Sequence, residues 1–108
     1  MPYRHYQLTY SISPKNAQCQ AEAQKARRAI KESSQFTNVD HLETVVVGEL
    51  YLARDSQYGQ KREAQEDIEN FITGILNDAE VFKYVHVHCS LMVDGLGEHL
   101  QFTVKDDS

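Results

Sequence analysis

Apolar side chains recur at every second position near the start of the chain, from Tyr3 to Ile12. A period of two with β-favouring residues predicts a half-buried strand, because successive strand side chains point to opposite faces. The expected inner face carries Tyr6, Leu8, Tyr10 and Ile12, and the outer face carries Tyr3, His5, Gln7, Thr9 and Ser11. Ser13 and Pro14 follow as an expected helix N-cap and first helical residue.

Two longer segments show the period of an α-helix. The first spans about residues 14 to 33 and the second about residues 60 to 79. The first has an inward stripe of mostly small residues, which are Cys19, Ala23, Ala26, Ala29 and Ile30. The second has a bulkier stripe, formed by Ala64, Ile68, Phe71, Ile72, Ile75 and Leu76. Each stripe predicts a helix that buries one face against a sheet.

The middle of the chain, residues 42–53, predicts a strand whose inward face the pattern leaves open. One alternating set is Val46, Leu50 and Leu52, and an equally apolar set is Val45, Val47 and Tyr51. Gly48 lies in the middle of the run and indicates a bulge or a change of face, so the segment is one strand or two short ones. The polar residues 33–40 and 54–59 around it are expected to form a loop and a turn.

The last third of the chain alternates over residues 82–93 and again over residues 98–104. Asp94-Gly95-Leu96-Gly97 between them predicts a short turn, and hence an antiparallel hairpin. The expected register pairs Val93 with Glu98, Leu91 with Leu100, Cys89 with Phe102 and Val87 with Val104. This register places nearly all apolar side chains of both strands on one face, whereas a slip of one residue would scatter them.

The predicted elements follow the order strand, helix, strand, helix, strand, strand. This order indicates an α+β protein, a two-layer sandwich of ferredoxin-like type or a permuted variant, β-α-β-α-β-β with an antiparallel C-terminal hairpin. A length of 108 residues is that of one domain, so residues 1–108 are expected to form a single unit. The pattern does not decide the strand order. Residues 105–108 are expected to be a disordered tail.

Composition narrows the expected partners and compartment. A formal net charge of −5 disfavours general binding to nucleic-acid phosphates or anionic membranes. No apolar run approaches the roughly 20 residues of a membrane span, and the N-terminus lacks the apolar core of a signal peptide. Cys19 and Cys89 are far apart and form no CxxC pair, so both thiols are expected to be reduced and the compartment to be cytoplasmic.

The outer face of the predicted sheet holds the residues with the most chemical potential. The candidate binding residues are Tyr3, His5, Tyr84, His86, His88, His99 and Gln101. Tyr and His combine apolar area with a polar tip, a composition that suits interfaces. The leading hypothesis is a small non-enzymatic binding or regulatory protein, which acts through its sheet face or a strand edge as a homodimer or with another protein.

Four alternatives remain for this face. His86 and His88 project the same way from one strand and could share a divalent metal ion. Tyr3 and Tyr84 could stack on single-stranded nucleic acid, although the face carries almost no Lys or Arg. A small-ligand enzyme of the dimeric ferredoxin-like kind, with this face as a pocket wall, rests on fold analogy alone. The fourth alternative is that these are ordinary solvent-facing strand residues without a binding function.

No motif of a known catalytic or cofactor site occurs, so no catalytic residue, resident metal or cofactor is predicted. One more cluster is notable on the first predicted helix, namely Lys25, Arg27, Arg28 and Lys31. Its place in the C-terminal half of the helix suits the helix dipole, and it predicts a solvated helix face. Binding of a phosphate or of an acidic partner is the alternative.

Overall fold

The computed structural model describes residues 3–39 and 41–106, without the side chain of residue 43. The chain alternates between strands and helices as the pattern predicts, with two short 3-10 turns added. The elements are β1 (Tyr3–Pro14), the 3-10 turn η1 (Ala17–Cys19), α1 (Gln20–Glu32), β2 (Thr37–Val39), β3 (Leu42–Tyr51), α2 (Gln57–Asp78), the 3-10 turn η2 (Phe82–Tyr84), β4 (Val85–Val93) and β5 (Leu100–Val104).

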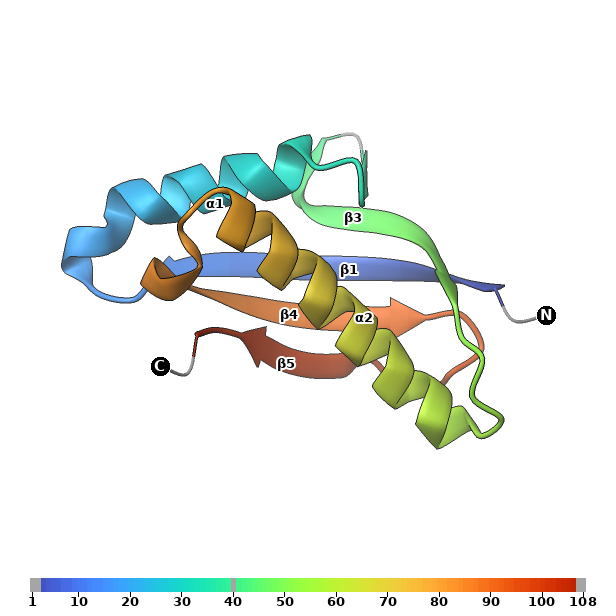
Figure 1. Ribbon diagram of the computed structural model, residues 1–108. Coiled ribbons are helices and arrows are strands. Elements are labelled where there is room, and N and C mark those ends of the chain that lie inside the picture. Colours follow the sequence, from blue (N-terminus) through green and yellow to red (C-terminus); the bar gives the residue numbers. More distant parts are fainter. Residues whose placement is uncertain (1–2, 40, 107–108) are drawn as a thin grey trace.

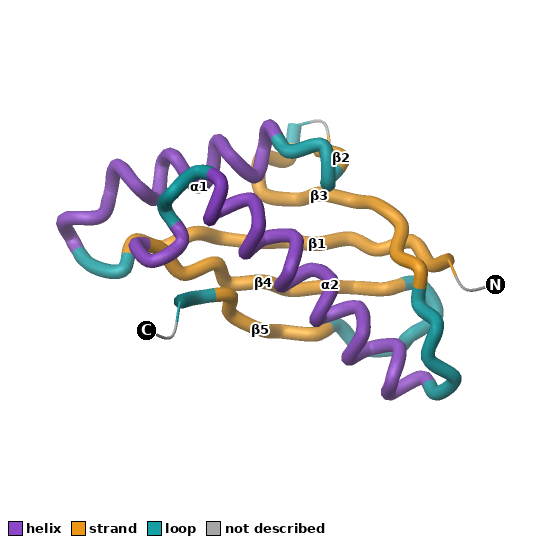
Figure 2. Tube along the Cα trace, in the orientation of Figure 1, coloured by secondary structure: helices purple, strands orange, loops and turns teal. Residues whose placement is uncertain are grey.

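The five strands form one sheet in the order β2-β3-β1-β4-β5, and every neighbouring pair is antiparallel. Both helices lie on the same face of this sheet (Figure 1), with α2 running diagonally across the strands. Figure 2 shows that the opposite face has no helix over it. The fold is therefore α+β, with one sheet face covered by helices and one left open.

The alternation of β1 is confirmed, and it separates the two faces of the sheet. Tyr6, Leu8, Tyr10 and Ile12 are buried under the helices, whereas the residues between them are exposed or partly exposed. The helices contribute their predicted stripes to the same core, with Ala23, Ala26 and Ile30 from α1 and Ala64, Ile68, Ile72 and Leu76 from α2. Because β1 is the central strand, its inner face contacts the middle of this core.

Pairing with β1 decides the inward face of β3, which the sequence pattern left open. The register runs without interruption from Tyr3↔Tyr51 to Thr9↔Val45, so Val46 and Leu50 point to the core. The segment is one strand, and the bulge expected at Gly48 is wrong. Gly48 lies opposite Tyr6, and a Cβ there would come within 2.6 Å of the Tyr6 hydroxyl and 2.8 Å of its ring. Glycine is required because its missing side chain leaves room for that ring.

Several element boundaries differ from the prediction. Helix α2 begins at Gln57, inside the residues 54–59 expected to form a turn, because the Ser56 side chain caps it by accepting a hydrogen bond from the Gly59 backbone N–H. Residues 13 and 14 continue β1, because β4 pairs with them as far as Pro14↔Val85. The helical segment therefore begins later, with the 3-10 turn η1 after Asn16, whose side chain accepts a hydrogen bond from the Gln18 backbone N–H at 2.9 Å, and α1 follows from Gln20. The predicted loop before β3 contains the short strand β2, which its polar composition concealed.

The C-terminal hairpin is confirmed in its register but not in its turn. Cys89 pairs with Phe102, Leu91 with Leu100 and Val87 with Val104. Strand β5 begins only at Leu100, so the connection runs from Asp94 to His99 and is longer than expected. Leu96 in this connection is buried, and Gly95 and Gly97 have φ angles of 78° and 84°. The connection is longer because Gly95 and Gly97 adopt left-handed backbone conformations, which glycine reaches without steric cost. These two conformations turn the chain so that Leu96 packs into the core.

The remaining predictions concern the cysteines and the C-terminus. Cys19 and Cys89 are both free and buried, as expected for two reduced thiols. The predicted tail, residues 105–108, lies partly outside the described residues. Within the described part, Lys105 and Asp106 follow β5 without regular secondary structure.

Candidate functional site: the open sheet face

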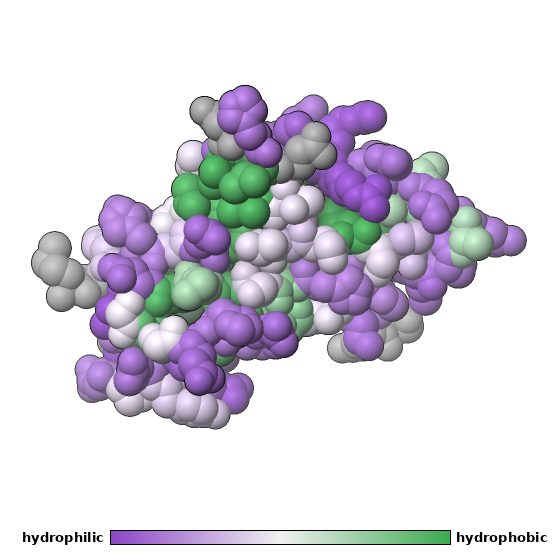
Figure 3. All heavy atoms as spheres, turned by 180° about the vertical axis from the view of Figure 1, so that it is seen from behind, coloured by the Kyte–Doolittle hydropathy of each residue, from purple (hydrophilic) through white to green (hydrophobic). Residues whose placement is uncertain are grey.

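The sheet face opposite the helices, here called the open face, collects outward side chains from every strand. Figure 3 shows the molecule from this side, where hydrophobic surface lies among polar and neutral residues. The strand pairings place on it Thr37 from β2, Val45, Val47, Glu49 and Tyr51 from β3, Tyr3, His5, Gln7, Thr9, Ser11 and Ser13 from β1, His86, His88, Ser90 and Met92 from β4, and Gln101 and Thr103 from β5.

The described side chains of the open face are almost free of formal charge, although 25% of the chain is charged. Glu49 is the only Asp, Glu, Lys or Arg among the open-face side chains named above. Its carboxylate lies 3.4 Å from the His5 imidazole across the β1–β3 pairing, and both side chains are more than half exposed. An exposed pair of this kind adds little stability, so the face is held by its backbone pairing rather than by ion pairs.

One end of the open face is aromatic. Tyr3 and Tyr51 are paired across β1 and β3, and their rings meet edge to face with centroids 5.2 Å apart. Both rings are more than half exposed, and so is Met92 on β4. Large apolar side chains exposed together are typical of association surfaces.

A chain of hydrogen bonds through His88 joins three strands at the other end. Ser13 Oγ lies 2.9 Å from His88 Nε2, and His88 Nδ1 lies 3.3 Å from Thr103 Oγ1. Hydroxyl groups donate and accept, so this chain is compatible with either imidazole tautomer. The group that orients the ring is a hydroxyl rather than the carboxylate of a Ser-His-Asp triad. The arrangement therefore fixes the ring without the group that would stabilise an imidazolium during nucleophilic catalysis.

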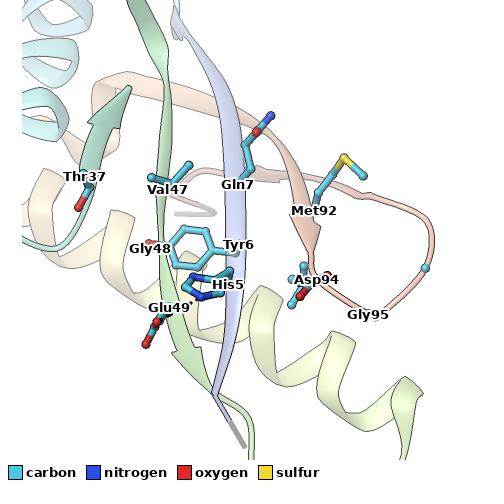
Figure 4. Close-up of a pocket in the computed structure, with 12 residues that line it drawn as sticks. His5, Tyr6, Gln7, Thr37, Val47, Gly48, Glu49, Met92, Asp94 and Gly95 are labelled. Atoms are coloured by element: carbon cyan, nitrogen blue, oxygen red, sulfur yellow. Dashed lines mark ion pairs between the residues drawn. The ribbon is translucent and has the colours of Figure 1, made fainter. Parts of the chain in front are cut away.

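Two hollows lie on the open face. The larger, of about 870 Å³, is lined by His5, Gln7, Val47, Glu49 and Met92 and reaches the Asp94–Gly97 turn (Figure 4). The smaller, of about 580 Å³, lies around His88, Ser90, Gln101 and Thr103. Neither hollow is lined by both His86 and His88. The face is therefore concave in two places: His5 lines the larger hollow, His88 lines the smaller one, and His86 lines neither.

Two ionisable groups beneath the face, the Tyr6 hydroxyl and the Cys89 thiol, are buried and neutral. Burial raises the pKa of the Tyr6 hydroxyl to about 12. Burial, with a smaller contribution from Glu69, raises the pKa of the Cys89 thiol to about 12. A thiol acts as a nucleophile only as the thiolate, so Cys89 is a small core residue facing Phe102, as the sequence predicts.

Five of the seven sequence-predicted binding residues lie on the open face: Tyr3, His5, His86, His88 and Gln101. His99 lies in the connection before β5 and is exposed. Tyr84 lies outside β4, in η2, because a 3-10 turn follows α2 after Glu80, whose φ angle is 62°. Its half-buried ring has the Lys83 ammonium 5.2 Å from its centroid.

The contribution of β3 to this face was not predicted from the sequence. Val45, Val47, Glu49 and Tyr51 are outward because they pair with the outward residues of β1. The signal available was the second alternating apolar set of that segment, which belongs to the open face.

The metal hypothesis gains no further ligand within the described residues. The His86 and His88 rings lie 6.4 Å apart and are perpendicular. Residues 3–39 and 41–106 contain no group of three or more His, Cys, Asp and Glu side chains arranged to hold a metal ion.

None of the helices in the described residues has both the length and the apolar character needed to cross a bilayer. The chain matches no known protein family, no curated protein and no solved structure.

Proposed function

We propose that this chain is a non-enzymatic binding protein that acts as a homodimer through its open face. One observation carries the proposal: among the described residues no helix lies over this face of the sheet, and the described side chains on it include a single carboxylate. Depletion of charge with exposed aromatic and Met residues distinguishes the core of an interface from ordinary surface. Tyr3, Tyr51 and Met92 are the expected anchors, because each is exposed in the single chain.

The size of the open face suits a stable dimer. Strands about 4.8 Å apart and about 3.3 Å per residue give a five-stranded face roughly 20 to 25 Å wide and 30 Å long. This is about 700 Å², near the approximately 800 Å² that each partner buries in a typical specific complex. Two sheets can pack face to face about 10 Å apart, and a two-fold axis makes the contact self-complementary.

The central strand β1 contains the position at which an added charge is expected to weaken this dimer most. An axis through the middle of the face lies close to Gln7 and Thr9 of β1, the strand between β3 and β4. Gln7 lies between Val47 and Met92 in the two strand pairings. A charge at this position would be buried twice in the dimer, once from each copy, without an opposite charge beside it.

The test is the isosteric substitution Gln7→Glu, with Gln20→Glu on the exposed surface of α1 as the matched control. Sedimentation equilibrium at neutral pH is expected to show a dimer for the wild type and the control. The dissociation constant of Gln7→Glu is expected to rise by at least about tenfold, which corresponds to about 1.4 kcal/mol. A monomer at all concentrations for the wild type, or an unchanged dimer for Gln7→Glu, would contradict the proposal.

A second candidate function is a small-ligand-binding enzyme that uses the same face. The observation that favours it is the hollow of about 870 Å³ beside His5 and Glu49, which lies within the size range of ligand pockets. A monomeric protein in which a small-molecule fragment shifts the His5 and Glu49 NMR signals would support this candidate over the dimer.

We also propose that the fold is a permuted ferredoxin-like one and that the protein is cytoplasmic. Strands β3 and β4 both run antiparallel to β1, which lies between them, and α2 connects them. This split β-α-β arrangement supports a permuted ferredoxin-like fold. Two free, buried cysteines support a reducing compartment such as the cytoplasm.

A further inference from the structure

A third hollow lies beside α1, on the helix side of the sheet. This α1 cleft has a volume of about 640 Å³. It forms where β3 leaves β1, because their pairing ends at Thr9↔Val45 while β1 continues to Pro14. Its lining residues are Gln24, Arg27, Arg28, Lys31 and Glu32 from α1, with Tyr10 from β1, Asn38 from β2 and Thr44 from β3.

The walls of the α1 cleft are held by two hydrogen bonds to backbone carbonyls. Arg27 is half-buried, and its Nη2 donates to the Ile12 carbonyl at 2.9 Å, where β1 has lost its β3 neighbour. Asn38 Nδ2 donates to the Lys31 carbonyl at 2.8 Å and ties β2 to the end of α1. The Arg27 guanidinium is therefore placed before any ligand arrives, which lowers the entropic cost of binding.

Charge is locally reversed in the α1 cleft. Three cationic side chains line it with one carboxylate, that of Glu32, although the whole chain has a net charge of −5. The cations fall on one stripe of α1 because Arg27, Arg28 and Lys31 are spaced at the three- and four-residue intervals of a helix face. Among the described residues, Arg28 and Lys31 form no ion pair with a carboxylate, and both are exposed.

We propose that the α1 cleft binds the phosphate group of a small organic phosphate. Two guanidinium groups and an ammonium match the charge and the several acceptor oxygens of a phosphate dianion. The cleft is far larger than a phosphate ion and has the size of a small-molecule pocket. Gln24, Asn38 and Thr44 supply neutral polar groups for the organic part. A long polyanion such as nucleic acid is disfavoured, because the net negative charge of the rest of the protein repels it.

The experiment is an NMR titration of the intact protein at constant ionic strength. The probes are adenosine monophosphate as a phosphate monoester, adenosine without the phosphate, and inorganic phosphate without the organic part. Adenosine monophosphate is expected to shift the signals of Gln24, Asn38 and Thr44 and to bind more tightly than either other probe. No shift at millimolar adenosine monophosphate, or equal affinity for adenosine or for inorganic phosphate, would overturn the proposal.

Two variants of the same helix separate a built site from general charge attraction. Lys31→Gln removes a lining cation, whereas Lys25→Gln makes the same change on the same helix outside the cleft. Lys31→Gln is expected to weaken binding of adenosine monophosphate by about tenfold, and Lys25→Gln by less than about twofold. Equal weakening by the two variants would overturn the site. Both residues are exposed, and unchanged signals from the core verify that each variant is folded.

Discussion

The two faces of the sheet come from the same strands and differ in almost every property. On the helix-covered face, alternate residues of β1 and β4 are buried in one apolar core. On the open face, the residues between them are Tyr, His, Met or uncharged polar side chains. Neighbouring residues of a strand therefore serve different ends: one set determines stability, and the other is available for binding. The comparison predicts that substitutions one residue apart have very different effects.

Leu8 and Thr9 provide the largest expected contrast. Leu8 is fully buried at the centre of the core, and Thr9 points to the open face. Leu8→Ala is expected to lower the free energy of unfolding by about 2 to 5 kcal/mol, because it leaves a cavity. Thr9→Ala is expected to cost about 1 kcal/mol or less, mainly through lost strand propensity. Urea denaturation of both variants at one protein concentration measures the contrast, and equal losses would mean that the faces are wrongly assigned.

Two glycines test whether the contact between β3 and β1 is as close as described. Gly48→Ala places a methyl group against the Tyr6 ring and is expected to destabilise the protein by about 1 to 3 kcal/mol. Gly74 lies in α2, and a Cβ there would meet nothing within 4 Å. Gly74→Ala is therefore expected to stabilise by about 0.5 to 1 kcal/mol. Thermal unfolding distinguishes the two, and a neutral Gly48→Ala would contradict the packing of Tyr6.

Alkaline pH probes two ionisable groups that are buried in the covered face, the Tyr6 hydroxyl and the Cys89 thiol. Burial raises the pKa of Tyr6 from 10.0 to about 12 and that of Cys89 from 9.0 to about 12. In each case the unfolded chain loses its proton first, so it binds fewer protons than the folded chain, and stability falls as pH rises. The loss is expected to begin near pH 9 and to continue to about pH 12.

The variants Tyr6→Phe and Cys89→Ala serve as controls for this loss. Each removes one buried titrating group, so each is expected to flatten the decline of the free energy of unfolding above pH 9. Denaturant titrations at several pH values measure the slope. A slope that neither variant changes would show that these buried groups do not govern alkaline stability.

Strict alternation of apolar and polar residues made most of the strands predictable from the sequence. In β1, β4 and β5 only one of the two alternating sets is apolar, so a shift of one residue would expose the core. Their faces and the Cys89↔Phe102 register were therefore predictable, and with them five of the seven candidate binding residues. In β3 both sets are apolar, so no local pattern could choose between Val46 and Val47. Only the antiparallel partner β1 decided that choice.

Close approach and non-local pairing explain the other differences. In the sequence, Gly48 is typical of a bulge, yet in the structure it leaves room for the Tyr6 ring from the neighbouring strand. Ser13 and Pro14 resemble a helix start, yet β4 extends β1 through them. Likewise, the sequence shows a basic cluster on α1, but it does not show that Lys31 lines the cleft and Lys25 does not.

By itself, the sequence determined the two helices, four of the five described strands and the two faces of three of those strands, because periodicity within a segment is a local property. The tertiary structure alone decided the strand order, the orientation of β3, the uncovered sheet face and the cleft beside α1. These depend on which segments meet in space, and that is set by how the whole chain buries its apolar surface at once.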